Sequence, residues 1–482
     1  MAAPWIALGT CSLAKNGRAR REGMVLIIVL WIILGLVTVV LLFAEGMRME
    51  YKASTNATAA LQAGQALEGA RRYLAYVLSD LATPGEFPTS DLYEAEDVPV
   101  GDATFWVIGR ADEDLAEADI PVFGLIDEAS KLNLNTATRE MIELLPNMTP
   151  DVAAAILDWR NSPDNPQPDG AESDFYMAGD PAYMCKNAPF ESVEELRWVR
   201  GVTRDLLYGA DTNRNGILDP GEKDADAIAG TTNISSSYSA FSRGLLDFVT
   251  VVTREPNVRA DGSPRADVRR PKNTELDALL HEKLGAGRAA QIEAAIDPQA
   301  ANIGSVLEFY LVGAVTAAEA PLIENAVTAN DGDYVQGRVN VNTAPREVLV
   351  CLPGIGEQYA DAIIAARRTK TEDELDSVIW VNEVLDRTHA VLAGPYITTR
   401  SFQVGADVAA LGKGGRGLRR SWMIFDTMGA APVVVYRCDE SYLGWPLGTA
   451  WDENQGSPSN SEDRGTEVGR NKLPSKSNKV IR

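Results

Sequence analysis

The sequence has few residues of the kinds that build disulfide frameworks, metal clusters or catalytic triads. Its 482 residues include four cysteines, none in a C-x-x-C pair, and two histidines, His281 and His389. The cysteines are too sparse for a disulfide framework or a zinc site, although one bridge among them is possible. The distance along the chain between the histidines predicts solvated or structural roles rather than a metal site. Without a nucleophile–base spacing or a phosphate loop, the sequence predicts no enzyme.

Positive charge is also in short supply. The chain has 45 Lys and Arg against 68 Asp and Glu, a formal net charge of −23. Attraction to phosphate backbones relies on clustered Lys and Arg, so this balance argues against general binding of nucleic acid. It suits an acidic body that can bind cations.

One long apolar run is present near the N-terminus. Residues 24–44 contain no ionisable side chain, and a helix of that length spans about 30 Å, the thickness of a bilayer core. Arg18, Arg20 and Arg21 precede it, which places the N-terminus in the cytoplasm by the positive-inside rule. The alternative is a secretory signal peptide, with a shorter apolar core and a small-x-small cleavage site. Because helical spacing of apolar residues continues beyond the run, we expect one helix over 24–82.

The chain contains an internal repeat. Residues 131–160 align without gaps on residues 338–367, with twelve of thirty positions identical. Each copy predicts a short extended segment and then two helices, with Thr136 and Thr343 as the caps of the first helix. FESVEEL, with Ser192 as a cap, and TEDEL (371–375) are interpreted as matching later helix starts.

The LPGIG turn of the second copy resembles a helix-hairpin-helix, a motif common in DNA-binding proteins. Such a turn offers backbone N–H groups to phosphate. Here Glu357 and Asp361 follow the turn, and the first copy has Asn147 and Thr149 in place of the glycines. Carboxylates at this position repel phosphate, so a compact helical packing module is favoured over a DNA-binding one.

Residues 211–222, DTNRNGILDPGE, match the loop of an EF-hand. The side chains at positions one, three, five, nine and twelve carry oxygen, position six is Gly216, and position seven offers a carbonyl. The predicted calcium ligands are Asp211, Asn213, Asn215, Ile217, Asp219 and Glu222. The alternative is a polar loop built on Asx-turns.

A second acidic stretch covers residues 163–187 and lacks EF-hand spacing. It is either a solvated loop or a second calcium site, with Glu172 and Asp174 as candidate ligands.

The N-terminus resembles the class III signal of type IV pilins and pseudopilins. In that family a prepilin peptidase cuts after the glycine, here Gly23, and methylates the new N-terminus, here Met24. Most such subunits carry Glu at the fifth mature position, which neutralises the N-terminal amine of a neighbour in the apolar filament core. This chain has Ile28 there, which suits a subunit at the filament tip.

Seven segments together are similar to type II secretion protein K, a minor pseudopilin. They are LIDEASKLNLNTA (125–137), AAAILDWR (153–160), DGAESDFY (169–176), KNAPFESVEEL (186–196), GVTRDLLYG (201–209), LLDFVTVVT (245–253) and RVNVNTAPREVL (338–349). The resemblance implies an α+β fold: a pilin-like N-terminal helix and antiparallel β-sheet, with a large inserted all-α domain of two related helix-hairpin-helix or SAM-like modules. It also implies Ca²⁺ in that domain, minor pseudopilins I and J as partners, a single-pass inner-membrane anchor with the body in the periplasm, and a role in starting and capping the pseudopilus.

The chain then divides into consecutive regions. We expect strands in 100–112, 401–411 and 431–438 on both sides of the helical modules. The regions are a leader (1–23), the N-terminal helix (24–82), a sheet domain (83–126 and 396–440), a first helical module with the calcium loop (127–253), a further helical insertion (254–337), a second helical module (338–395) and a disordered tail (451–482).

One alternative function remains at this stage. Membrane-anchored DNA receptors carry the same NVNTA…LPGIG hairpin, and such a receptor would have a basic head with one intact hairpin. This chain has an acidic head and one degenerate copy.

Overall fold

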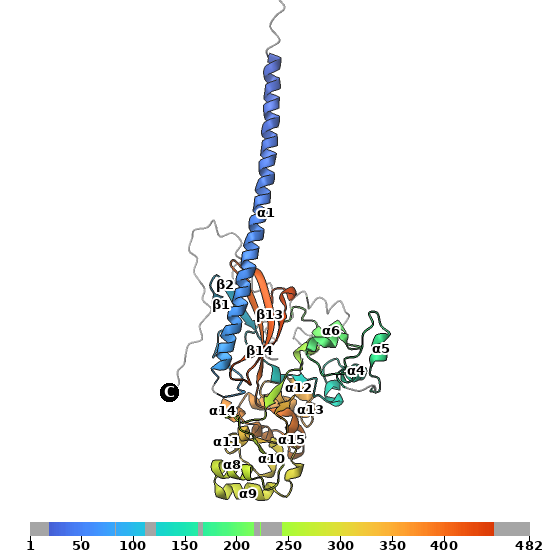
Figure 1. The fold of residues 1–482 in the computed structure, drawn as a ribbon, viewed down its shortest axis with the longest axis vertical. Helices are drawn as coiled ribbons and strands as arrows, with labels where there is room; N and C mark the ends of the chain where they lie inside the picture. The colour runs from blue at the N-terminus through green and yellow to red at the C-terminus, as the bar shows by residue number, and fades with distance from the viewer. Residues whose placement is uncertain are drawn as a thin grey trace, which may run out of the picture.

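A long helix, an antiparallel sheet and a helical domain make up the molecule (Figure 1). The computed structural model describes residues 19–81, 83–110, 122–161, 167–215, 222 and 243–447. The leader before residue 19 and the tail after residue 447 lie outside the described residues.

Helix α1 (Ala19–Ser79) has two halves in different surroundings. From Met24 to Phe43 every large apolar side chain is at least 47% exposed, and this half projects from the body (Figure 1). This segment is long and apolar enough to cross a membrane. In the second half, Ala63, Ala70 and Leu74 are fully buried against the sheet. The apolar residues of this helix therefore surround it in the first half and follow one face in the second.

The sheet is antiparallel, and its strands come from both ends of the chain. Its order is β1 (Val98–Val100), β2 (Ala103–Ile108), β12 (Gln403–Gly412), β13 (Arg416–Asp426) and β14 (Val433–Asp439), with β3 (Ile126–Asp127) also paired to β12. The expected combination of a long N-terminal helix, an antiparallel sheet and helical regions is thus confirmed.

Helix α1 lies close against the hairpin of β12 and β13. A Cβ atom at Gly412 would stand 2.1 Å from the main-chain oxygen of Ala59, and one at Gly417 would stand 2.3 Å from the nitrogen of Ala60. Glycine at these two positions lets the helix backbone reach the hairpin, so any side chain there would separate the two.

The first module follows β3 along the chain. Its elements are η1 (Glu128–Ser130), β4 (Leu132–Asn133), α3 (Arg139–Glu143), α4 (Pro150–Arg160), α5 (Ser173–Met177), η2 (Val193–Trp198), α6 (Arg204–Tyr208), η3 (Leu245–Asp247) and β5 (Val249–Thr250). The last module contains β10 (Val339–Asn340), α12 (Arg346–Val350), α13 (Gly356–Arg367), α14 (Glu372–Leu375), η6 (Val378–Glu383), α15 (Arg387–Ala393), η7 (Gly394–Tyr396) and β11 (Ile397–Thr398).

These two modules have the same main-chain frame. In each, the two short strands pair in parallel, β4 with β5 and β10 with β11. The side-chain oxygen of the first asparagine accepts the N–H two residues later, in Asn135 (2.9 Å) and in Asn342 (3.0 Å). The arginine that ends the second helix donates to two carbonyls of the turn between the first short strand and the first helix. Arg160 donates to Leu134 and Ala137, and Arg367 donates to Val341 and Ala344.

The helix caps differ from those expected. Thr138, not Thr136, caps α3, and α12 begins after Pro345 without a side-chain cap. Thr343 instead donates its hydroxyl to Asp127. Each helix begins two residues later than expected, so neither predicted threonine is at the cap position. Thr136 donates its hydroxyl to the carbonyl of Asn133 within the turn, and Thr343 contacts β3 through Asp127.

The expected pairing of later helix starts also needs correction. Ser192 caps η2 as expected, but its counterpart in the last module is Ser377, which caps η6 in the same way. Thr371 of TEDEL caps the separate helix α14. FESVEEL and TEDEL were matched because both contain acidic residues. Glutamates favour the first turn of any helix, so this similarity does not identify equivalent helices.

Residues 254–337 contain a third copy of this frame, here named the middle module. Its elements are β7 (Ala266–Asp267), α8 (Thr274–Leu284), α9 (Ala286–Ile296), η4 (Ala300–Asn302), α10 (Val306–Val312), α11 (Ala320–Ile323), η5 (Glu324–Ala326) and β8 (Val327–Thr328). Strands β7 and β8 pair in parallel, and Ser305 caps α10 as Ser192 caps η2. In all three modules, the residue after the first short strand donates its N–H to the carbonyl of the threonine that ends the second short strand. The pairs are Leu134 and Thr250, Val268 and Thr328, and Val341 and Thr398.

The middle module is attached through two short strands. Strand β6 (Arg254–Pro256) pairs antiparallel with β9 (Tyr334–Gln336), so the chain leaves and re-enters at one place. In Figure 1 the helices α8 and α9 lie at the end of the molecule opposite the free half of α1. The three modules therefore form one continuous helical domain with a shared core.

Candidate metal centre and its docking surface

Hydrogen bonds join the two ends of the loop predicted to bind calcium. The carboxylate of Glu222 accepts the N–H of Thr212 (2.8 Å) and of Asn213 (3.3 Å). At the start of the loop, the N–H of Asn215 donates to the side-chain oxygens of both Asp211 (3.1 Å) and Asn213 (3.0 Å). Positions one, three and twelve of the motif are thus gathered at one place.

The described part of this loop fits a calcium ion. Asp211 is 4% exposed and Asn215 is 1% exposed, although both are polar. Calcium is bound by carboxylate and amide oxygens of this kind, and a buried carboxylate gains most from a cation. The predicted ligands Ile217 and Asp219 lie outside the described residues.

A buried arginine of the sheet holds the same loop. Arg420, on β13, is fully buried and forms an ion pair with Asp407 on β12 (Nε–Oδ1 2.9 Å). Its guanidinium also donates to the main-chain oxygens of Asn213 (2.5 Å) and Arg214 (2.8 Å). Burial opposes the charge of Arg420, but Asp407 offsets this and raises the pKa of the guanidinium. Loop positions three and four are therefore fixed to the sheet.

A second contact between loop and sheet starts from the loop itself. Arg214 forms ion pairs with Glu440 (2.5 Å), just after β14, and with Glu194 (3.4 Å) of η2. Its guanidinium lies over the ring of Tyr208. Burial raises the pKa of Glu440 to about 7, and Asp407 raises it too, while Arg214 and Arg420 act against this shift.

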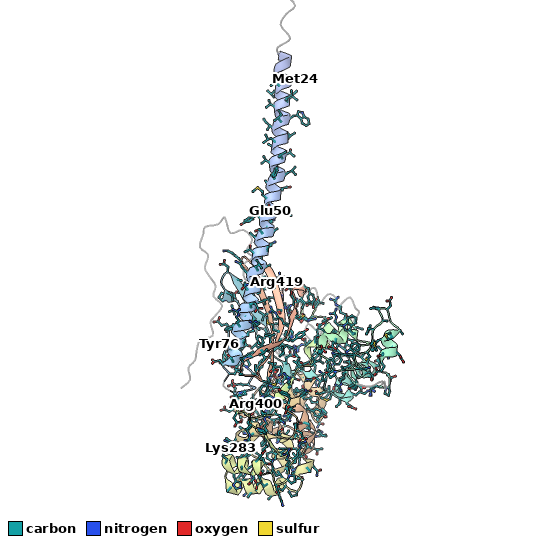
Figure 2. All side chains as sticks on the ribbon, in the orientation of Figure 1. Met24, Glu50, Tyr76, Lys283, Arg400 and Arg419 are labelled. Atoms are coloured by element: carbon teal, nitrogen blue, oxygen red, sulfur yellow. The ribbon has the colours of Figure 1, made fainter. Side chains whose placement is uncertain are left out.

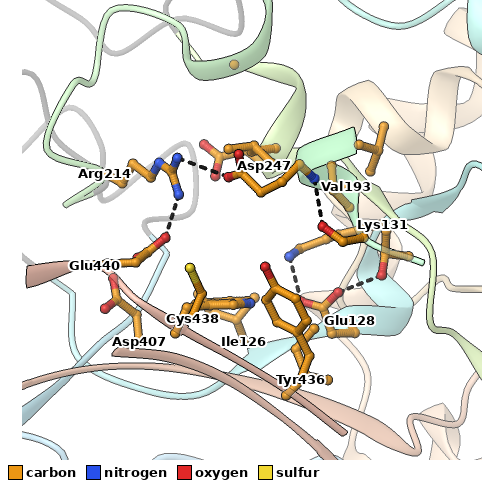
Figure 3. A pocket seen from close by; sticks show the side chains of 18 of the residues that line it. Ile126, Glu128, Lys131, Val193, Arg214, Asp247, Asp407, Tyr436, Cys438 and Glu440 are labelled. Atoms are coloured by element: carbon orange, nitrogen blue, oxygen red, sulfur yellow. Dashed lines mark hydrogen bonds and ion pairs between the residues drawn. The ribbon is translucent and has the colours of Figure 1, made fainter. Parts of the chain in front are cut away.

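These side chains line one wall of a cavity between the sheet and the first module. Figure 3 shows Arg214 and Glu440 at one end of it and the Glu128–Lys131 pair at the other. The cavity has a volume of about 130 Å³. Lys131 is 2.6 Å from Glu128, and burial lowers the pKa of this lysine while Glu128 raises it.

Two acidic residues, Asp127 at the end of β3 and Glu128 directly after it, join the modules to the sheet. Glu128 accepts the hydroxyl of Thr250 (2.6 Å) in the first module. Asp127 accepts the amide of Asn340 (3.0 Å) and the hydroxyls of Thr343 (2.5 Å) and Ser401 (2.6 Å), which belong to the last module and its exit. Burial raises the pKa of Asp127 to about 6, although these hydrogen bonds lower it.

The two candidate ligands of the second predicted metal site lie at helix α5. Glu172 is the N-cap residue of α5, and Asp174 is exposed in the first turn of that helix. The side-chain amide of Asn187 faces Glu172 Oε2 (3.2 Å) and the carbonyl oxygens of Asp158 (3.3 Å) and Asn161 (3.1 Å). With its side-chain nitrogen turned inward, Asn187 donates to all three oxygens and satisfies them without an ion. Asp174 is not part of this group.

The remaining predicted positions lie away from the loop. Met24 and Ile28 are in the exposed half of α1, and Gly23 is one residue before Met24 in the same helix; Figure 2 labels Met24 at the free end. The cysteines Cys185, Cys351 and Cys438 are free thiols, so no bridge joins the described cysteines. Burial raises the pKa of Cys351 to about 12, which keeps this thiol protonated and unreactive.

Sequence reasoning missed the sheet residues that hold the loop. Asp407 stands inside the apolar strand pattern SFQVGADVAAL, and Arg420 follows a polar stretch. A charged residue in an apolar strand predicts a buried partner, but the partner can be found only once strand pairing is known.

At the turn after α12, glycine serves packing. Gly354 has φ 79°, and a Cβ atom there would stand 2.3 Å from the main-chain oxygen of His389 in α15. Asn147 takes the same place in the first module with φ 58°. The G-x-G turn therefore presses against another helix, which supports the packing interpretation.

Comparison with known proteins gives one match to a family model and one match to a solved structure. Residues 128–209, from η1 to α6, match the family model described as "Type II secretion system (T2SS), protein K". No curated protein matches the chain in sequence. A chain in "The Crystal Structure of the GspK-GspI-GspJ complex from enterotoxigenic Escherichia coli Type 2 Secretion System" is 11% identical, with a TM-score of 0.37, over 82% of this chain and 99% of that chain.

Proposed function

We propose that this chain, which carries the first domain of type II secretion system protein K in residues 128–209, is the minor pseudopilin at the tip of a type II secretion pseudopilus. The family match is the observation that carries this proposal. It supports the resemblance that seven separate segments of the sequence indicated.

The two halves of α1 support a pilin-like anchor. The half from Met24 to Phe43 has no partner within the described residues, and its exposed side chains suit the lipid core of the inner membrane. The part of α1 from Ala59 onward packs on the sheet, so one helix joins the apolar segment to the body. With Arg18, Arg20 and Arg21 before the apolar run, the body would lie in the periplasm.

The proposed partners are the minor pseudopilins I and J. The solved relative comes from a complex of three such proteins, as its name says. Ile28, at the fifth mature position, cannot neutralise the N-terminal amine of a neighbour, so this subunit would start and cap the filament rather than extend it. The bulk of three helical modules would block addition above it. The chain would then do structural work without catalysis.

Calcium would stabilise the docking of the first module. The described ligands Asp211, Asn213, Asn215 and Glu222 would hold the ion, with Ile217 and Asp219 completing the loop. Its carbonyls at Asn213 and Arg214 are already bound by Arg420 of the sheet. An ion that orders the loop would therefore also fix the module on the sheet.

Mass spectrometry of the N-terminal peptide, from membranes of the native organism, tests the pilin-like assignment. We expect a chain that begins at N-methylated Met24, cut after Gly23 by the prepilin peptidase. An uncut and unmethylated N-terminus would overturn the assignment. The membrane-anchored DNA receptor would then be tested by DNA binding at low salt, where phosphate contacts are strongest.

A further inference from the structure

Three metal-ligating side chains meet in the middle module, far from the loop described above. Helices α8 and α9 are joined by Gly285, with φ 82°, and pack against each other. Asp277 and His281 lie one turn apart on α8, and Glu293 lies on α9. Each offers one ligand atom, and the three atoms lie within 4.8 Å of one another. The distance between His281 Nε2 and Asp277 Oδ1 is 3.1 Å.

Glu293 supplies a second observation that indicates a missing ligand. Glu293 is partly exposed, but its Oε1 atom is buried and accepts no hydrogen bond from the protein, and the group that faces this side chain is the carboxyl of Asp277. Burial raises the pKa of this carboxyl, and Asp277 raises it too, because the two acidic groups face each other. A buried carboxylate oxygen without a partner is costly, and a cation between the two carboxyls would remove that cost.

The donor set selects the kind of ion. An imidazole nitrogen beside two carboxylates suits zinc and similar divalent transition metals, whereas calcium and magnesium prefer oxygen alone. Zinc bonds of about 2.0–2.2 Å place tetrahedral ligand atoms about 3.3–3.6 Å apart, and the measured separation of 3.1 Å is close to this. Two carboxylates also balance the charge of a divalent ion. His281 and Asp277 are exposed, so water can complete the coordination.

We propose that Asp277, His281 and Glu293 bind one Zn²⁺ ion, which ties α8 to α9. The ion would stiffen the part of the body farthest from the membrane, where Figure 2 labels Lys283 of the same helix. The sequence did not indicate this site, because its histidine and its third ligand belong to different helices.

The other histidine of the chain provides a matched control. His389 Nδ1 lies 2.6 Å from Asp386 Oδ2, so these residues form a second Asp–His pair, at the N-terminus of α15. Within the described residues, no third His, Cys, Asp or Glu joins that pair as a ligand. Tyr359 donates to Asp386 instead (3.0 Å). A histidine–carboxylate pair alone should bind zinc only weakly.

The test is titration of the purified full chain in detergent with Zn²⁺, in excess Ca²⁺, followed by calorimetry. We expect one Zn²⁺ per chain. His281→Asn and Glu293→Gln should each weaken binding at least about tenfold, and His389→Asn should leave it unchanged. His281 is exposed and Glu293 is partly exposed, and equal thermal midpoints of the metal-free variants would show that each still folds.

Hydrogen exchange places the ion. Zn²⁺ should slow amide exchange in residues 274–296 of the wild type and not of His281→Asn, because binding to the folded state suppresses local opening. Equal zinc affinity of wild type and His281→Asn would overturn the proposal. So would protection confined to segments around the cysteines.

Discussion

The first and last modules share one frame but are held to the sheet by different chemistry. The first module is attached through charge: Arg420 reaches two carbonyls of its loop, and Arg214 reaches Glu440. The last module is attached through one carboxyl, Asp127, which accepts hydrogen bonds from Asn340 and its neighbours. The repeated residues thus build the frame, whereas the docking residues lie mainly outside the repeat.

The middle module extends this comparison. It keeps the parallel strand pair and the capping serine, but Asp267 stands in the place of the repeated asparagine and bonds to the N–H of Arg269 (2.9 Å). Helix α9 has no basic residue in its last turn, where Arg160 and Arg367 end their helices. The frame therefore tolerates loss of the arginine when other contacts hold the turn.

Arg420→Met should have the largest effect and should separate the first module from the sheet. It leaves Asp407 buried without its partner, which costs about 3–5 kcal/mol. Urea unfolding should show a lower midpoint, and calcium should no longer protect the first module from protease.

Arg437→Met is the matched control for Arg420→Met. Arg437 lies on β14, next to the strand of Arg420, and its exposed ion pair with Glu68 of α1 is worth about 0–1 kcal/mol. If both variants lost the same stability, the docking role of Arg420 would be wrong.

Asp127→Asn should change how stability depends on pH. The folded pKa of Asp127 is about 6, above its ordinary value of 3.8, so the folded state binds the extra proton between these values. Its contribution is therefore present below about pH 4 and is lost as pH rises to about 6, by on the order of 3 kcal/mol.

Thermal midpoints from pH 4 to 7 measure this effect. The difference between wild type and Asp127→Asn should shrink between pH 4 and about pH 6 and then level off. A difference that stays constant over this range would contradict the assignment of the pKa.

Arg160→Met and Arg367→Met should cost the two modules similar stability. Each removes two hydrogen bonds from a charged donor to turn carbonyls, an effect of about 1.5–3 kcal/mol. Hydrogen exchange can measure each module separately. A large loss of stability in one module and none in the other would show that the two arginines do not stabilise their modules equally.

Glu222→Gln should have the smallest effect, confined to calcium. Replacing the carboxylate at the last loop position should weaken Ca²⁺ binding about tenfold, or about 1.4 kcal/mol. Glu191→Gln, at an exposed site in the same module, is the control. Calorimetry with both variants decides the matter, and equal Ca²⁺ affinity would remove the loop from the proposed site.

Local patterns were enough for several parts of the structure. The helix expected over 24–82 is α1 (Ala19–Ser79), and the strands expected in 100–112, 401–411 and 431–438 contain β2, β12 and β14. Strand β13 was not picked out, because its arginines hide the alternating pattern, and one of them is Arg420. The repeat was visible because the same side chains make the same local hydrogen bonds.

The sequence by itself determined the apolar helix, the repeated frame and the order of oxygen donors in the loop. Each depends on residues close together in the chain, so spacing alone reveals it. Only the tertiary structure decided the third module, the contact of Arg420 with the loop, and the meeting of His281 with Glu293. Those depend on main-chain hydrogen bonds, strand pairing and helix packing, which join residues that no local spacing connects.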